Sequence, residues 1–200
     1  KNQPGLIVVD RTVKGEFENY QTPEGEVPAT QLDIPWETCY SLYGWGWRKG
    51  ATLKSSKKVL AVLIEVVAKG GNFLLGVGPK PDGTIEEQAV DRVTTIGKWL
   101  DKNGEAIYAT VNARKYNDGN VWFTQSKDGK KMYAMYALKE DDPEVPAVIE
   151  WTGNIPAGKK VTLLSTGKRV KCEVDGDRVK VYLPKHVDRT ESLAFSFGIK

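Results

Sequence analysis

The stretch from residue 70 to residue 84 constrains the fold of this chain more than any other. It reads Gly-Gly-Asn-Phe-Leu-Leu-Gly-Val-Gly-Pro-Lys-Pro-Asp-Gly-Thr. Its apolar run, residues 73–77, is closed by glycine and proline, which predicts a buried strand ending in a tight loop. Apolar residues at helical spacing precede it over residues 56–69 and follow it over residues 85–103. This order predicts a parallel α/β fold, in which the loops after the strands carry the chemistry.

Further elements are predicted on the N-terminal side of this block. Residues 6–10 and 36–42 have the apolar character of strands, and glycines and prolines punctuate the residues between them. Thr84 has an acidic residue three positions later, which is the spacing of a capping box. The helix over residues 85–103 is therefore expected to begin at Thr84.

The pattern changes near residue 110, where short alternating segments replace the helical ones. Three Asp-Gly pairs in this half are typical of hairpin turns. Many short strands in about ninety residues predict an antiparallel β-sandwich over residues 110–200. The predicted strands are 106–109, 121–125, 131–138, 147–151, 160–164, 169–174, 178–183 and 192–197.

Composition excludes several classes of function. Lysine and arginine are mixed with aspartate and glutamate along the whole chain, the net charge is only +3, and no apolar run reaches membrane-spanning length. We therefore expect neither a nucleic acid nor a membrane as partner. A single histidine and two distant cysteines make a metal site or a serine–histidine triad improbable. No metal and no cofactor is expected, and the chemistry is narrowed towards carboxylates.

Three residues are candidates for a site. Glu24 follows an irregular, aromatic stretch and has the side chain needed to protonate a leaving oxygen, although a solvated loop glutamate is the alternative. Arg11 ends the first predicted strand, where it would bind sugar hydroxyls or a carboxylate, or else form a structural salt bridge. Trp45 lies in a cluster of tryptophans that suits the C–H face of a sugar, or else forms a packed aromatic corner.

Taken together, the motifs resemble those of the α-L-fucosidases of glycoside hydrolase family 29. The resemblance covers most of residues 6–110, and beyond residue 110 it is one of pattern only. The segments that carry it are Val9-Asp10-Arg11, Thr22-Pro23-Glu24, Pro35-Trp36-Glu37-Thr38-Cys39 with Trp45-Gly46-Trp47, residues 70–79, residues 82–85 and residues 99–108.

The resemblance implies a fold, an activity and roles for the three candidates. Residues 1–109 would be the last strands and helices of a (β/α)8-type barrel, followed by the β-sandwich domain of residues 110–200. The activity would be that of a retaining exo-α-L-fucosidase acting on fucosylated glycans. Glu24 would be the general acid/base, Arg11 would contact fucose or orient the nucleophile, and Trp45 would stack on the sugar near its methyl group.

The same resemblance implies that this chain is the C-terminal portion of the enzyme. The family's nucleophilic aspartate and its sugar-binding histidines lie in upstream motifs that are not in this sequence, so the isolated chain is expected to be inactive. It would require an N-terminal barrel portion, on the same polypeptide or on a separate chain. The family's members imply a secreted, periplasmic or lysosomal location, which the sequence itself leaves open.

Two other functions compete with this interpretation. The β half, with Trp122 and Trp151, is a candidate carbohydrate-binding module without catalysis. Alternatively, the chain is a structural module that only completes a barrel supplied by another polypeptide.

Overall fold

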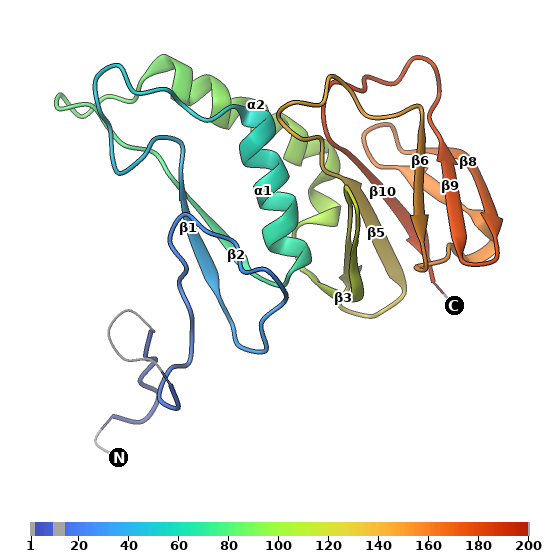
Figure 1. Cartoon of the computed structure of the whole chain (residues 1–200), viewed down its shortest axis with the longest axis horizontal. Helices are drawn as coiled ribbons and strands as arrows, with labels where there is room; N and C mark the ends of the chain where they lie inside the picture. Colours follow the sequence, from blue (N-terminus) through green and yellow to red (C-terminus); the bar gives the residue numbers. More distant parts are fainter. Residues whose placement is uncertain (1–2, 10–14, 200) are drawn as a thin grey trace.

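The computed structural model describes residues 3–9 and 15–199, and these form a helical, parallel-stranded part beside a larger antiparallel one (Figure 1). In the first part, β1 (Glu37–Ser41) and β2 (Asn72–Gly76) pair in parallel. The chain crosses between them through α1 (Ser56–Ala68), and α2 (Glu87–Asn103) follows β2. The predicted order of helix, strand, loop and helix is confirmed.

Single parallel bridges extend this layer beyond β1. Bridges join Glu24 to Cys39, Gln21 to Trp36 and Val9 to Tyr20. The Gly25 amide donates to the Cys39 carbonyl at 2.8 Å, which fixes the segment around Glu24 against β1. The predicted strand over residues 6–10 is thus represented by an isolated bridge at residue 9, and residue 10 lies outside the described residues.

Close packing explains the glycines of the block after α1. A Cβ on Gly71 would lie 2.4 Å from the indole of Trp36, and one on Gly78 would lie 2.2 Å from the backbone nitrogen of Trp47. Such distances are far inside van der Waals contact, so neither position accepts a side chain without movement of its neighbours. Gly78 thereby holds the loop after β2 directly against the loop after β1.

The two helices begin differently. Ser55 caps α1 by accepting a hydrogen bond from the Lys58 amide at 3.0 Å. The capping box predicted at Thr84 is wrong, because α2 begins after Glu86 without a side-chain cap. Thr84 instead donates its amide and its hydroxyl to the Asp82 carboxylate, at 2.9 and 2.7 Å. This local turn occupies the hydroxyl that a capping box needs.

The antiparallel part is one eight-stranded sheet in the order β3-β4-β5-β10-β7-β8-β9-β6, which confirms the antiparallel expectation. The strand predicted over residues 106–109 is wrong: η1 (Gly104–Ala106) and a turn occupy this region, and Ala106 and Ile107 are buried under the helices. The strands are β3 (Thr110–Asp118), β4 (Val121–Ser126), β5 (Lys131–Tyr136), β6 (Val148–Thr152), β7 (Val161–Leu163), β8 (Lys168–Asp175), β9 (Arg178–Tyr182) and β10 (Leu193–Gly198), with the short helix η2 (Ala157–Lys159) before β7.

This sheet curls until it is nearly closed. β8 pairs with β7 through its first residues and with β9 through its later ones, so it joins the two halves of the sheet. The edge strands β3 and β6 are linked by side chains: the Thr152 amide donates to the Asp118 carboxylate at 2.7 Å, and Lys115 Nζ donates to the Thr152 carbonyl at 2.7 Å. The curled sheet encloses its own apolar core, in which Phe123 and Trp151 are among the largest side chains.

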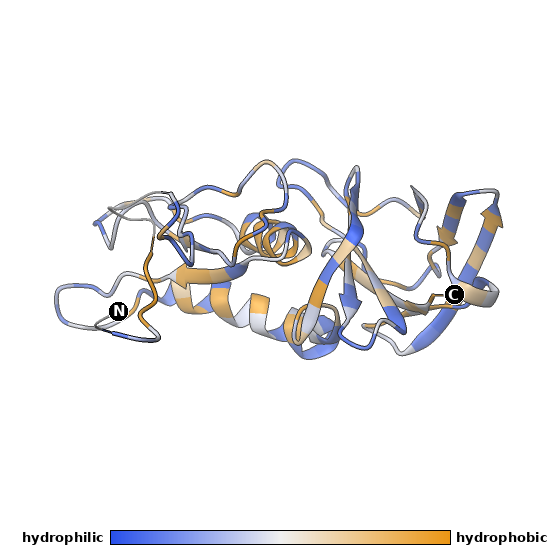
Figure 2. Ribbon diagram, turned by 90° about the horizontal axis from the view of Figure 1, so that it is seen from below, coloured by the Kyte–Doolittle hydropathy of each residue, from blue (hydrophilic) through white to orange (hydrophobic). Residues whose placement is uncertain are grey.

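A second apolar core joins the two parts of the molecule. Leu63 of α1 and Ile96 of α2 belong to the same buried cluster as Tyr133 and Met135 on the outer face of the sheet. The Trp99 indole nitrogen also donates to the Ser192 carbonyl at 2.6 Å. Figure 2 shows the hydrophobic faces of the helices and of the strands beside them. Both faces of β5 are therefore buried.

Candidate active site

A hollow of about 780 Å³ lies at the carboxyl ends of the parallel strands. Glu24 and Trp45 both line it, so the structure brings these two candidates together. Arg11, the third candidate, lies outside the described residues. The lining residues are Glu24, Gly25, Cys39, Tyr40, Ser41, Tyr43, Gly44, Trp45, Gly46, Lys54, Lys58, Leu74, Gly76, Val77 and Gly78.

Strand pairing places Glu24 on the open face of the parallel layer. Thr38 and Tyr40 of β1 are buried, whereas Cys39 between them is only partly covered. Residues paired across neighbouring strands project to the same face, and Glu24 is the bridge partner of Cys39. The carboxyl group of Glu24 therefore belongs to the face that lies opposite α1.

Trp45 lies at the tip of the loop between β1 and α1, where its side chain is 94% exposed. Its neighbours in the loop at residues 44, 46 and 48–50 are also exposed, but Tyr43 anchors the loop. Tyr43 is buried and donates its hydroxyl to Glu86 at 3.1 Å, which ties this loop to the start of α2. Burial first, and then the Glu86 carboxylate, raise the pKa of Tyr43. The loop therefore presents an exposed indole two residues from this anchor.

Lys54, near the end of this loop, binds back to its beginning. Its Nζ donates to the carbonyls of Ser41 and Tyr43, at 2.6 and 2.8 Å, and lies 4.8 Å from the centre of the Tyr40 ring. Burial, and secondly the charge of Lys58, lower the pKa of Lys54. Sequence analysis missed Lys54 because its role arises only when residue 54 folds back onto the end of β1.

A second carboxylate, Glu37, lies on the open face at the opposite ends of the strands. It lines a separate hollow of about 590 Å³ that also includes Asn72 and Tyr108. Burial, and then a hydrogen bond with Glu37, raise the pKa of Tyr20. Glu24 and Glu37 therefore face different hollows, although both side chains belong to one face.

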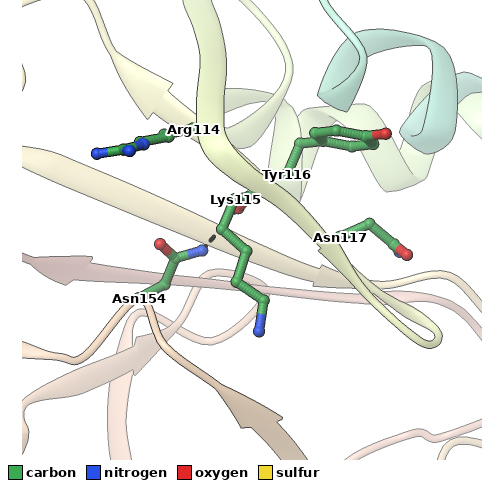
Figure 3. Close-up of a pocket in the computed structure, with 5 residues that line it drawn as sticks. All are labelled: Arg114, Lys115, Tyr116, Asn117 and Asn154. Carbon is green, nitrogen blue, oxygen red and sulfur yellow. Dashed lines mark hydrogen bonds between the residues drawn. The ribbon is translucent and has the colours of Figure 1, made fainter. Parts of the chain in front are cut away.

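The antiparallel sheet has a hollow of its own, of about 540 Å³, at the seam between its edge strands (Figure 3). Arg114, Lys115, Tyr116 and Asn117 line it from β3, and Asn154 crosses the seam to donate to the Lys115 carbonyl at 2.8 Å. Lys115 Nζ also contacts Asp118 at 2.9 Å. The polar side chains of this hollow thus join the two edges of the sheet.

The tryptophans of a possible carbohydrate-binding module are engaged within the protein. Trp151 is buried inside the curled sheet and stacks on Phe197, with 5.9 Å between ring centres. Trp122 is half-buried between the Tyr116 ring, at 6.4 Å, and Lys69 Nζ, at 5.5 Å. Trp151, one of the two tryptophans of the carbohydrate-binding alternative, is therefore not accessible to a glycan.

Residues 3–9 and 15–199 contain no group of three or more histidine, cysteine, aspartate or glutamate side chains placed to hold a metal ion. Within the same residues, no helix is long and apolar enough to cross a membrane.

Comparison with known proteins identifies the family. The profile of the alpha-L-fucosidase family matches residues 1–105. The chain is 33% identical to the tissue alpha-L-fucosidase of Bos taurus over 181 residues, which are 86% of this chain and 38% of the bovine protein. It is 31% identical to the human tissue enzyme over 182 residues, again 86% of this chain and 38% of the relative.

Solved structures agree with this assignment. Alpha-L-fucosidase isoenzyme 1 from Paenibacillus thiaminolyticus superposes with a TM-score of 0.78 at 26% identity, over 92% of this chain and 46% of the bacterial one. The Thermotoga maritima alpha-fucosidase in complex with fucose gives a TM-score of 0.75 at 25% identity, over 98% of this chain and 46% of the Thermotoga chain. The chain thus spans less than half the length of these proteins. It belongs to the alpha-L-fucosidase family.

Proposed function

We propose that the protein is a retaining exo-α-L-fucosidase and that this chain is its C-terminal portion. Residues 1–109 would supply the last strands and helices of a (β/α)8-type barrel, and residues 110–200 the β domain packed against it. The parallel order of the segment around Glu24, β1 and β2 supports this arrangement. So does the hollow at the carboxyl ends of these strands, which is where barrel enzymes place their sites.

In this proposal Glu24 is the general acid/base. A retaining glycosidase uses two carboxyl groups about 5–5.5 Å apart, one that attacks the anomeric carbon and one that protonates the leaving oxygen. Glu24 donates this proton and then takes a proton from water, which hydrolyses the glycosyl-enzyme. The nucleophile is an aspartate outside the present sequence, Trp45 stacks on the sugar, and Arg11 contacts fucose or orients the nucleophile.

One observation carries the assignment of Glu24: it shares a hollow with Trp45 at the carboxyl ends of the strands. Glu37 is the competing carboxylate on this face. Glu37 is hydrogen-bonded with Tyr20 and lines the hollow at the other ends of β1 and β2. A proton donor at that end would face away from the exposed indole that is proposed to hold the sugar.

The alternative is that the chain only completes a barrel and contributes no reacting group. In both cases the remainder of the protein is needed, and the isolated chain is expected not to release fucose. The two proposals differ in what Glu24 does.

The test uses the full-length protein and two isosteric variants, Glu24→Gln and Glu37→Gln. We expect Glu24→Gln to lower kcat/KM for a fucosylated oligosaccharide by roughly 10²- to 10⁴-fold, which is the usual contribution of a general acid/base. The loss should be much smaller for 4-nitrophenyl fucoside, whose leaving group needs no protonation. Glu37→Gln should lower kcat/KM less than tenfold and equally for both substrates.

Equal activity of Glu24→Gln and the unmodified protein on the oligosaccharide would leave only the barrel-completing function. If Glu37→Gln instead lowers kcat/KM for the oligosaccharide much more than for 4-nitrophenyl fucoside, Glu37 is the general acid/base.

A further inference from the structure

The hollow that contains Glu24 carries more positive than negative charge. Among the described residues that line it, Glu24 is the only acid, whereas Lys54 and Lys58 are both basic. A glycosidase acting only on neutral sugars has no need of an ammonium group beside its acid. The two lysines therefore require an explanation.

Lys54 is explained by its contacts within the protein. Its ammonium group is bound to two main-chain carbonyls, at 2.6 and 2.8 Å, and lies over the Tyr40 ring. These contacts hold the start of the loop that carries Trp45. Lys54 is a positioning residue, and its charge adds to the potential of the hollow.

Lys58 has no such role. Its side chain is exposed, and within the described residues its ammonium group makes no ion pair. Of the acids nearby, Glu140 is hydrogen-bonded to the Ser55 hydroxyl. The Lys58 ammonium is therefore available to a ligand in the hollow.

The position of Lys58 is also electrostatically unfavourable for the helix. It lies in the first turn of α1, which contains no acidic residue. The amino end of a helix carries partial positive charge, so an anion there stabilises the helix and a cation destabilises it. Lys57, its neighbour, is compensated by the Asp142 carbonyl at 2.9 Å, whereas Lys58 has no comparable partner among the described residues. Local rules of this kind are broken mainly at functional sites, so the unfavourable position of Lys58 is a reason to look for its ligand.

We infer that Lys58 determines specificity: it favours fucosylated glycans that carry an anionic group, a carboxylate or a sulfate ester, on the sugar next to fucose. This inference rests on the proposed function, because it assigns the leaving-group side of the same hollow. The ammonium group of Lys58 is the recognition element. The anionic group contacts Lys58 while the glycosidic oxygen is next to Glu24.

The test compares three oligosaccharides that differ only in the sugar next to fucose: neutral, 6-sulfated and sialylated. The full-length enzyme is assayed as the unmodified protein, as Lys58→Gln, and as Lys49→Gln. Lys49 is exposed on the loop between β1 and α1 but does not line the hollow, so Lys49→Gln matches the change in net charge. We expect Lys58→Gln to lower kcat/KM for the acidic substrates about three- to tenfold. The neutral substrate should change less than twofold.

Three further results are expected. Lys49→Gln leaves the ranking of the substrates unchanged, and Lys58→Arg retains the preference for acidic ones. Added salt reduces the preference, because the contact is solvent-exposed and screened. Comparing the sulfated with the sialylated substrate shows which anionic group is recognised.

The inference is overturned if Lys58→Gln affects all three substrates equally, as it would if Lys58 paired with an acid in the rest of the enzyme. It is also overturned if Lys49→Gln has the same effect. To separate it from the proposed function, binding of the same oligosaccharides to Glu24→Gln is measured by calorimetry. A preference for acidic glycans that depends on Lys58 there supports the inference even if Glu24 proves not to be the acid/base.

Discussion

Single residues decide how the two loops of the hollow meet. Gly78 is the clearest case, because the space for its Cβ is occupied by the backbone of the neighbouring loop. The sequence predicts only a tight loop at this position, and the structure adds a second reason for glycine, the close approach of two loops of the chain. The glycine is what allows the loop with Trp45 to rest on the loop after β2.

We predict that Gly78→Ala destabilises the chain. The added methyl group would lie 2.2 Å from the Trp47 nitrogen, so the two loops must separate. Overpacking of this kind costs about 1–3 kcal/mol in the free energy of unfolding, which urea denaturation measures. Gly44→Ala is the matched control, because nothing lies within 4 Å of its Cβ position. Equal stability of the two variants would show that the loops do not pack as described.

At the scale of elements, the sequence predicts best those helices and strands whose pattern is formed by residues close together along the chain. The helices over residues 56–69 and 85–103 and the strand over residues 73–77 were expected close to where α1, α2 and β2 lie, because hydrophobic periodicity is a property of neighbouring residues. β3 was not expected. It is an edge strand with mostly polar residues and an irregular register between Asn112 and Asn117, so it shows no alternation.

The site was predictable to the same degree. Glu24 and Trp45 were predicted from motifs, and both line the hollow, while their catalytic and sugar-binding roles stay predictions. Lys54 and Lys58 also line the hollow and were not predicted, because Lys54 reaches it through a loop that folds back and Lys58 through its place at the start of a helix. The curling of the sheet was also beyond the sequence, because it depends on side chains of β3 and β6 that are distant along the chain.

The link between β3 and β6 should make stability depend on pH. Hydrogen bonds from Thr152, and then contacts with Lys115, lower the pKa of Asp118 to about 2 from 3.8. A carboxyl group with a depressed folded-state pKa stabilises the protein above its unfolded-state pKa, and this stabilisation is lost as the pH falls. The contribution of Asp118 is therefore complete above about pH 4 and disappears between about pH 4 and pH 2.

We predict that Asp118→Asn lowers the urea midpoint of unfolding at pH 7. The difference from the unmodified chain should shrink as the pH falls from 4 to 2, since the unmodified protein loses the same interaction there. Asp141→Asn, in an exposed loop, is the control and should change the midpoint little at any pH. A difference that stays constant down to pH 2 would mean that the ionised carboxylate is not what holds the two edges together.

At the scale of the whole molecule, the two expected domains are joined by one apolar core to which both contribute side chains. β5 contributes Met132 and Ala134 to the inside of the curled sheet, and Tyr133 and Met135 to the core shared with α1 and α2. Burial and a hydrogen bond to Glu105 raise the pKa of Tyr133 to about 12, so its hydroxyl stays protonated. We propose that residues 1–109 and 110–200 are domains by topology but depend on one another for stability.

This proposal predicts that one substitution affects stability in the complete chain but not in a fragment. In the complete 200-residue chain, Met135→Lys places a charge in the shared core and should cost about 3 kcal/mol or more in the free energy of unfolding. In a fragment of residues 110–200 the same position faces water, so the substitution should leave stability nearly unchanged and reduce self-association. Urea denaturation measures the first effect and sedimentation velocity the second. If the unmodified fragment is monomeric and unfolds at the same urea concentration as the complete chain, the sheet does not need the helices. That result would overturn the proposed dependence of residues 110–200 on the helices.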